Sequence, residues 1–513
     1  MFGAFFLRCD NMMNIKKKRS LDMLAMRAAI LVLAAAIWLL IVAGDKSSDV
    51  FYMIADGRNM LSEGLYGPCA ATWHNLQNVI CQNWVFCILL ALADSLNPAY
   101  GPYFVYGPVM LLFFIVFMKD MEEQMNSAAL GSLVGILAAL SVGFWPLSQM
   151  RPEAMTALLL VLHCRVLRKC REYGTAKTCM LSAAIMVAEA NMHGTMLPLH
   201  FCALAAYAVP SFAKRAYADT RTIRPVQAVI LCLSMFLAGC LNPWGIKLYT
   251  VPFEAFRVFQ TVFVAEQSVL KTTDFNAVSS MVLLFTVVYL VIRRRIGSSS
   301  FYLCMGFGVL GMMKVHGSVA LPAAVCQLAH VFAIDEENAS VLDEQVAGAA
   351  RRVILPVSAV TLLFVSAFTY DAAKWPGVSF EKAALHIADQ YEASGGSFRV
   401  ITDSAAGSFL EYMGVTDCFA DGRAELLSGR LNHVKDLIPE YKWLRSGVQT
   451  QELCNQYGDL DGYLRDNRVR YVVMNYDDPR YMYLVGWIER SPDWSILYAY
   501  GHGNMCVWEY TGP

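Results

Sequence analysis

The stretch Ala28-Ala-Ile-Leu-Val-Leu-Ala-Ala-Ala-Ile-Trp-Leu-Leu-Ile-Val-Ala-Gly44 decides the fold, because it is apolar throughout and carries no charge. A membrane crossing takes about 20 mainly apolar residues, so this run predicts a transmembrane helix. No small-residue cleavage site follows it cleanly, which favours a signal anchor over a removable signal peptide. The basic residues that precede it are Arg8, Lys16, Lys17, Lys18, Arg19 and Arg27.

Apolar runs of the same kind recur along the next 330 or so residues. The whole chain is 57% hydrophobic and 16% charged, which is too hydrophobic for an ordinary soluble enzyme. We therefore predict a mainly α, polytopic transmembrane helix bundle of about eleven spans. The ten further runs are 103–118, 128–145, 153–168, 178–190, 197–212, 226–240, 278–292, 299–313, 319–333 and 352–370.

The charge balance divides the chain into two parts. Residues 371–513 carry 13 Lys and Arg against 20 Asp and Glu, whereas residues 1–370 carry 28 against 22. We expect residues 1–370 to form the transmembrane domain, with a first outer loop at 45–83, and residues 371–513 to form a soluble α/β domain. Its predicted strands are 398–403, 417–421, 470–475 and a hairpin over 494–510, and its predicted helices are 405–412 and 431–443.

The loop charges predict the orientation in the membrane, because basic loops stay cytoplasmic. With the N-terminus inside, inner segments hold 21 Lys and Arg and outer loops hold 7. This places the chain as a multi-pass protein of the cytoplasmic (inner) membrane, with the C-terminal domain extracytoplasmic. Eleven spans with this orientation require that Trp84–Leu96 does not cross the membrane but lies along its outer face or re-enters it. If Trp84–Leu96 does cross, another short apolar run must fail to cross.

Polar motifs within the hydrophobic part then all fall on the outer face. Asp49 lies just beyond the first span, and Arg151-Pro-Glu153, Asn191-Met-His-Gly194 and Lys314-Val-His-Gly317 follow later spans. Ionisable groups at membrane depth are costly, so their convergence indicates a site. A carboxylate such as Asp49 can accept a proton from an attacking hydroxyl, or it can simply cap the helix that begins at Val50.

These motifs, in this order, resemble bacterial multi-span proteins of the type C glycosyltransferase superfamily, related to protein O-mannosyltransferases and aminoarabinose transferases. The matching stretches are Asp49 to Pro68, Arg151-Pro-Glu153, Glu189-Ala-Asn-Met-His-Gly194, Leu241-Asn-Pro-Trp-Gly245 and Glu266, with Phe398 to Asp403 and Phe419-Ala-Asp-Gly-Arg423 in the tail. The resemblance implies inverting transfer of a sugar from a polyprenyl-phosphate carrier to an acceptor at the outer face. The acceptor is an unknown glycan, lipid or protein, and membrane lipids are the other partners.

The resemblance implies that Asp49 is the catalytic or acceptor-orienting carboxylate. Because a phosphate leaving group needs cations or donors, Arg151, Lys314, His193 and His316 are the candidate substrate-binding residues, together with Glu266 and with Trp84 at the end of the outer loop. Lys314 stands where many relatives have an arginine. A lysine still binds phosphate as a point charge, but it cannot form the two parallel hydrogen bonds of an arginine. Asn83 stands where an acidic residue or His is common.

Each candidate also has a simpler interpretation. Arg151 can anchor a helix end at the headgroups, His193 and His316 can be packed at helix junctions, and Glu266 can lie on a solvated face. The Asp421-Gly-Arg423 stretch is most simply a turn closed by a salt bridge. No cofactor is implied with certainty, although Asp49, Asp56 and Glu266 could bind a divalent cation.

Two other functions stay open. A polytopic transporter or lipid flippase would use buried polar groups as a path, but the inverted repeats of many transporters are not evident. A non-catalytic assembly protein could keep the same fold without the chemistry. The sequence has no Walker loop, dinucleotide fingerprint or zinc pattern, and we expect no nucleic-acid partner.

Overall fold

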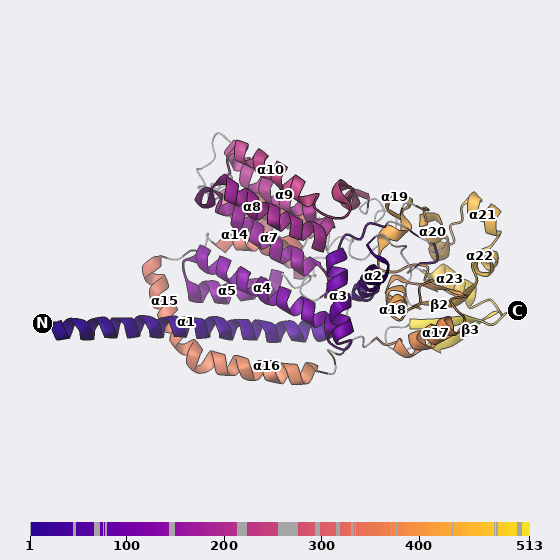
Figure 1. Cartoon of the computed structure of the whole chain (residues 1–513), viewed down its shortest axis with the longest axis horizontal. Helices are drawn as coiled ribbons and strands as arrows, with labels where there is room; N and C mark the ends of the chain where they lie inside the picture. The colour runs from indigo at the N-terminus through magenta and orange to yellow at the C-terminus, as the bar shows by residue number, and fades with distance from the viewer. Residues whose placement is uncertain are drawn as a thin grey trace.

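The computed structural model describes residues 2–44, 48–65, 72–74, 76, 79–142, 149–212, 223–254, 275–292, 298–313, 319–329, 333, 335–370, 372, 374, 378–432, 434–476, 478, 481–499 and 505–512. The chain is mostly helical up to residue 370 and ends in a smaller part that contains a β-sheet (Figure 1). The helices of the first part are α1 (Phe2–Gly44), α2 (Asp49–Glu63), α3 (Trp84–Leu96), α4 (Gly101–Met125), α5 (Ala128–Val142), α7 (Glu153–Arg168), α8 (Cys170–Met192), α9 (Leu197–Ala208), α10 (Pro225–Gly239), α12 (Phe275–Ile292), α13 (Ser299–Met313), α14 (Leu321–Leu328), α15 (Glu336–Ala349) and α16 (Leu355–Thr369).

Every apolar run predicted as a span contains a helix. Within the described part of the chain, three helices are both long and apolar enough to cross a membrane, namely Leu21–Ala43, Gly101–Met125 and Arg352–Thr369. Figure 1 shows α16 lying beside α1, and its apolar side chains face outward: Leu363, Phe364 and Phe368 are all more than 70% exposed. Exposed apolar surface of this size is stable only against lipid or protein. The number of spans, eleven, stays a prediction.

Helix α3 lies across the ends of the bundle and does not run parallel to it (Figure 1). It is one-sided: Phe86 and Leu90 are buried, whereas Leu92 and Leu96 are exposed. A short helix with a buried face and an exposed apolar face suits the membrane surface. The placement of Trp84–Leu96 along the outer face, or its re-entry into the membrane, stays a prediction.

Helix α2 packs tightly on α3 because a glycine lies at their contact. A Cβ atom added at Gly57 would lie 2.1 Å from the backbone oxygen of Cys87. Only a residue without a side chain permits this approach. The first residue of α2 is Asp49, so the Gly57 contact also positions Asp49.

We expect Gly57→Ala to force α2 and α3 apart and to destabilise the protein by about 1–3 kcal/mol, as other overpacking substitutions do. The unfolding temperature of the full-length protein in detergent measures this effect. Gly107→Ala is the matched control, since Gly107 lies within α4 and an added Cβ meets no atom within 4 Å. An equal unfolding temperature for Gly57→Ala and the control would contradict the packing argument.

The C-terminal part is built around a four-stranded sheet in the order β1-β2-β4-β3. β1 and β2 are parallel, while β2 pairs antiparallel with β4 and β4 pairs antiparallel with β3. Fully buried side chains of β2, including Val472 and Val473, form the centre of its core. The elements are α17 (Glu381–Ala393), β1 (Arg399–Thr402), α18 (Ser404–Tyr412), α19 (Gly429–Asn432), α20 (Ile438–Ser446), α21 (Gln451–Tyr457), α22 (Leu460–Asp466), β2 (Val469–Asn475), α23 (Met482–Ile488), β3 (Trp494–Ala499) and β4 (Met505–Tyr510).

The strands predicted at 398–403, 470–475 and 494–510 are present, whereas the strand predicted at 417–421 is wrong. Cys418 forms only isolated bridges, to Val400 on β1 and to Thr72 of the first outer loop. The segment leaves the sheet edge after one residue because Asp421 and Gly422 turn toward α2. The helix predicted at 431–443 is divided between α19 and α20.

Candidate active site

The two residues that sequence analysis put at the centre of the site contact each other. Arg151 Nε lies 3.1 Å from Asp49 Oδ2. Asp49 is the first residue of α2, and Arg151 lies two residues before the start of α7, whose N-cap residue is Pro152. The Arg151 side chain is 9% exposed and that of Asp49 is 20% exposed. A charge pair this sheltered is screened less than a surface pair.

Tyr106 of α4 lies close enough to the Asp49–Arg151 pair to interact with it electrostatically. Its side chain is buried, its ring packs edge-to-face on Phe86, and it interacts electrostatically with Asp49, Arg151 and Glu153. Within the described part of the chain, its hydroxyl has no hydrogen-bond partner. Buried hydroxyls are normally satisfied, so this donor is available to a bound polar molecule.

His193 belongs to a buried polar chain that enters the bundle from the site. The Thr156 hydroxyl donates to Glu189 Oε1 at 2.5 Å and lies 2.8 Å from His193 Nδ1. Because a hydroxyl has one proton, His193 Nδ1 is the donor in the second bond. Glu189 Oε2 lies 3.3 Å from His200 Nε2, and His200 Nδ1 lies 3.1 Å from His163 Nδ1. His193 is thus oriented by α7 and α8.

Trp84, one of the predicted substrate-binding residues, contacts the segment that contains His193. Its indole nitrogen donates to Asn191 Oδ1 at 3.0 Å, and the Gly194 amide donates to the Gln82 oxygen at 2.8 Å. The turn that precedes α3 is therefore attached to the Asn191-Met-His-Gly194 motif at the end of α8. In this structure, Trp84 holds the His193 segment in place.

A turn of the C-terminal part lies directly over Asp49. A Cβ atom added at Gly422 would lie 2.7 Å from Asp49 Oδ1 and 2.9 Å from the Tyr52 ring. Next to it, Arg423 Nη1 binds Asp56 Oδ1 of α2 at 2.5 Å and its guanidinium lies 5.3 Å from the centre of the Tyr52 ring. The turn is closed by the predicted Asp421–Arg423 salt bridge, but Arg423 also joins the two halves of the chain.

Three buried carboxyl groups surround this one guanidinium. Arg423 contacts Asp56, Asp421 and Glu411 of α18, and Glu411 Oε2 lies 3.4 Å from Arg423 Nη2. Burial, followed by the charge of Asp421, raises the pKa of Glu411 well above its usual value. Burial likewise raises the pKa of Asp56. One positive charge cannot neutralise three carboxylates, so Glu411 binds a proton more tightly in the folded protein than in the unfolded protein.

This proton makes the stability of the folded protein depend on pH. Because the pKa of Glu411 is higher in the folded state than in the unfolded state, its contribution is complete below about pH 4.5, the ordinary value for Glu. That contribution is lost as the pH rises through the raised pKa. We expect the unfolding temperature to fall as the pH rises above 4.5, and Glu411→Gln to reduce this fall.

Unfolding curves recorded from pH 4.5 to pH 8 test this expectation. Glu452→Gln is the control, since Glu452 is an exposed carboxylate of the same domain. Parallel pH profiles for wild type and Glu411→Gln would contradict a raised pKa of Glu411.

Three predicted residues, Lys314, His316 and Glu266, lie outside the described residues. Of the three residues that could bind a divalent cation, Asp49 and Asp56 are therefore described and Glu266 is not. Asp49 and Asp56 each bind an arginine, and a guanidinium beside a carboxylate disfavours a cation on the same oxygen. We assign no step of the chemistry to a metal.

No protein-family model matches the chain, and no curated protein sequence matches it. Among solved structures, the apo form of ArnT from Cupriavidus metallidurans is 13% identical and superposes with a TM-score of 0.52, covering 93% of this chain and 96% of ArnT. The oligosaccharyltransferase of Archaeoglobus fulgidus is also similar. Its apo form is 11% identical with a TM-score of 0.48, covering 87% of this chain and 69% of the enzyme.

The form of that enzyme tethered to an acceptor peptide is 12% identical, with a TM-score of 0.49 and coverage of 87% and 68%. The similarity to ArnT extends over nearly the full length of both chains. The chain therefore has the overall fold of ArnT, which agrees with the fold expected from the resemblance drawn from the short motifs.

Proposed function

We propose that this protein is a multi-pass membrane glycosyltransferase that moves a sugar from a polyprenyl-phosphate carrier to an acceptor at the outer face of the cytoplasmic membrane. The observation that carries the proposal is the sheltered Asp49–Arg151 pair at 3.1 Å. It lies where the helix bundle, the first outer loop and the C-terminal turn meet. In this proposal the N-terminus is cytoplasmic and residues 371–513 form the extracytoplasmic domain.

Arg151 supplies the site for the donor phosphate. A guanidinium binds phosphate oxygens in a bidentate manner, with hydrogen bonds stronger than those between neutral groups. When the donor phosphate binds Arg151, it displaces the Asp49 carboxylate from that guanidinium. The same event therefore prepares the leaving group and releases the base.

Asp49 then acts on the acceptor. Its carboxylate accepts the proton of the acceptor hydroxyl while the hydroxyl oxygen forms a bond to the sugar C1 atom. The bond from C1 to the phosphate oxygen breaks on the opposite side, and its electron pair leaves with the polyprenyl phosphate. This displacement inverts the configuration at C1. Lys314, His316 and Glu266 remain proposed substrate-binding residues.

In this proposal His193 and Tyr106 assist in binding the phosphate. His193 is held by Thr156, which in turn is held by Glu189. Hydrogen-bond donors fixed before the reaction stabilise the charge that develops on the leaving group. The buried Tyr106 hydroxyl is such a donor beside Arg151.

A transporter or flippase is the second candidate, and one observation favours it. The chain formed by Thr156, Glu189, His200 and His163 is fully buried inside the bundle. Intramembrane ionisable residues commonly mark transport paths or proton relays. A third candidate, an assembly protein without activity, would keep the fold but transfer no sugar.

One assay separates the three candidates. Purified protein in lipid nanodiscs is incubated with a panel of polyprenyl-phosphate sugars and an extract of envelope glycans, lipids and proteins. Release of free polyprenyl phosphate and sugar incorporation are measured by mass spectrometry. Turnover of any donor supports the proposal. Movement of a labelled lipid across the vesicle membrane without sugar transfer favours the flippase. The absence of both sugar transfer and lipid movement favours the assembly protein.

A further inference from the structure

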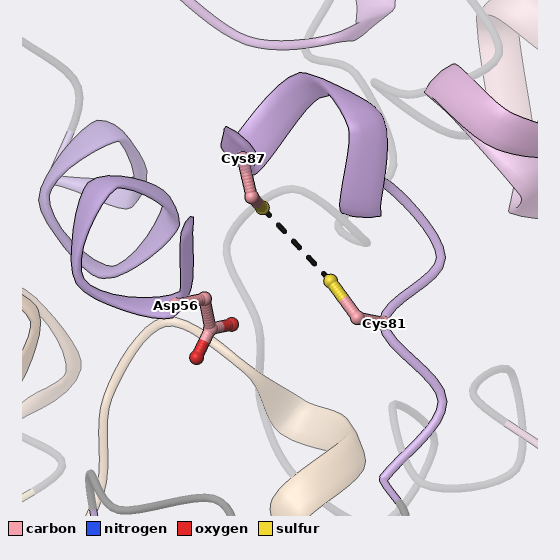
Figure 2. Close-up of side chains that lie close together, drawn as sticks. All are labelled: Asp56, Cys81 and Cys87. Carbon is pink, nitrogen blue, oxygen red and sulfur yellow. Dashed lines mark hydrogen bonds between the residues drawn. The ribbon is translucent and has the colours of Figure 1, made fainter. Parts of the chain in front are cut away.

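Two cysteines beside the site lie close together in a way that the proposed reaction does not use. Cys81 precedes α3 and Cys87 lies in its first turn, with their sulfur atoms 3.9 Å apart. Figure 2 shows the two thiols pointing toward each other. Cys87 is fully buried, while Cys81 is partly exposed. Both are thiols in this structure.

The residues between these cysteines hold the candidate site together. The Gln82 oxygen accepts a hydrogen bond from the Gly194 amide, and the Trp84 indole donates one to Asn191. This turn is therefore hydrogen-bonded to the chain on both sides of His193. The Asn83 side chain donates to the Met53 sulfur of α2 at 3.0 Å. A bond between Cys81 and Cys87 would close a short loop around these contacts.

We propose that Cys81 and Cys87 form a disulfide at the outer face of the membrane, and that this bond clamps the turn that positions His193. The inference rests on the proposed orientation, which puts both cysteines in an oxidising compartment. It does not depend on sugar transfer. A disulfide needs the sulfurs at about 2.05 Å, so the 3.9 Å gap closes by a modest rotation of the two side chains.

The oxidant is a disulfide of the general form RSSR. Cys81, which is the more accessible thiol, attacks one of its sulfurs and releases RSH. Cys87 then attacks the Cys81 sulfur of the mixed disulfide and releases the second RSH. The two electrons and both thiol protons end in the two RSH molecules. Burial raises the pKa of Cys87 and so lowers its thiolate fraction, which is why the first attack is assigned to Cys81 and not to Cys87.

A metal ion is the competing interpretation, because Asp56, Cys81 and Cys87 offer ligand atoms within 4.8 Å of one another (Figure 2). The Asp56 carboxylate, however, binds Arg423 at 2.5 Å. A guanidinium repels a cation, and without Asp56 only two thiols remain, whereas a structural zinc site takes four ligands. The described residues therefore favour the disulfide.

The test is a map of the cysteine linkages in full-length protein from membranes prepared without reductant. Free thiols are blocked with N-ethylmaleimide, and the protein is cut with chymotrypsin. Cleavage after Trp73 and Trp84 puts Cys69, Cys81 and Cys87 on separate peptides, so mass spectrometry identifies each linkage. We expect the Cys81 and Cys87 peptides as one species, about 2 Da lighter than the sum of the two free peptides.

Three variants complete the test. Cys69→Ser should keep the linked species, whereas Cys81→Ser and Cys87→Ser should each lose it. Dithiothreitol should lower the unfolding temperature of wild type but not that of Cys87→Ser. A Cys69–Cys81 linkage, or complete labelling of both Cys81 and Cys87 after treatment with oxidised glutathione, would overturn the proposal. Zinc bound by the reduced protein and lost from both Cys→Ser variants would overturn it in favour of the metal.

Discussion

Asp49→Asn should lower kcat/KM for sugar transfer by about 10²- to 10⁴-fold, the range expected when a general base is removed. The amide keeps the size of the side chain but cannot accept the proton of the acceptor hydroxyl. It also removes the negative charge that neutralises Arg151 at 3.1 Å. The donor phosphate then no longer competes with the Asp49 carboxylate for Arg151, so donor binding should be equal or tighter.

Two measurements distinguish a lost base from a damaged fold. Turnover and the affinity for the polyprenyl-phosphate sugar are determined in nanodiscs for wild type, Asp49→Asn and Glu63→Gln. Glu63 is the matched control, because it is an exposed carboxylate at the other end of α2. Equal turnover of Asp49→Asn and wild type would remove Asp49 from its role. Loss of donor affinity in parallel with turnover would assign Asp49 to binding instead.

The second large effect is expected at Arg423. Arg423→Met leaves Asp56, Asp421 and Glu411 buried without their shared guanidinium. Removal of one partner from a buried ion pair costs about 3–5 kcal/mol, because the remaining charge has neither water nor a counter-ion. The C-terminal part should separate from α2 and expose Asp49, so both stability and transfer should decrease.

Limited proteolysis and thermal unfolding of the full-length protein measure this loss. We expect faster cleavage between residues 371 and 399 and a lower unfolding temperature. Arg465→Met is the control, since Arg465 is exposed in α22 of the same part. Adding Asp56→Asn and Asp421→Asn to Arg423→Met should restore part of the stability, because two of the three acids left without their guanidinium are then neutral amides. No recovery in this triple variant would argue against the electrostatic explanation.

Local sequence patterns were sufficient for most of the helices and strands. The run Ala28–Gly44 is helical, and the short apolar run Tyr471–Met474 belongs to β2, where it is buried throughout. Residues 417–421 were misassigned because a short apolar segment has the same composition whether it pairs along its length or at one residue. Cys418 forms single bridges because the next residues turn toward α2, which no local pattern reveals.

The pairing of Asp49 with Arg151 was expected as a shared pocket, and the structure places the two in direct contact. Helix capping, the simpler interpretation of Asp49, is not what its carboxylate does here, since it pairs with Arg151. The contact between Arg423 and Asp56 was missed. These residues are 367 positions apart, and the Asp421-Gly-Arg423 stretch already had a local explanation in its own salt bridge.

The sequence by itself determined that the chain is a mainly helical membrane protein whose C-terminal part has a different charge balance, because apolar length and charge segregation act locally and additively along the chain. Only the tertiary structure decided which acid meets which base. Asp49 binds Arg151, Asp56 binds Arg423, and Gly422 lies over Asp49. Such contacts depend on how α2 is held between the bundle and the C-terminal sheet, and this packing is a property of the whole chain.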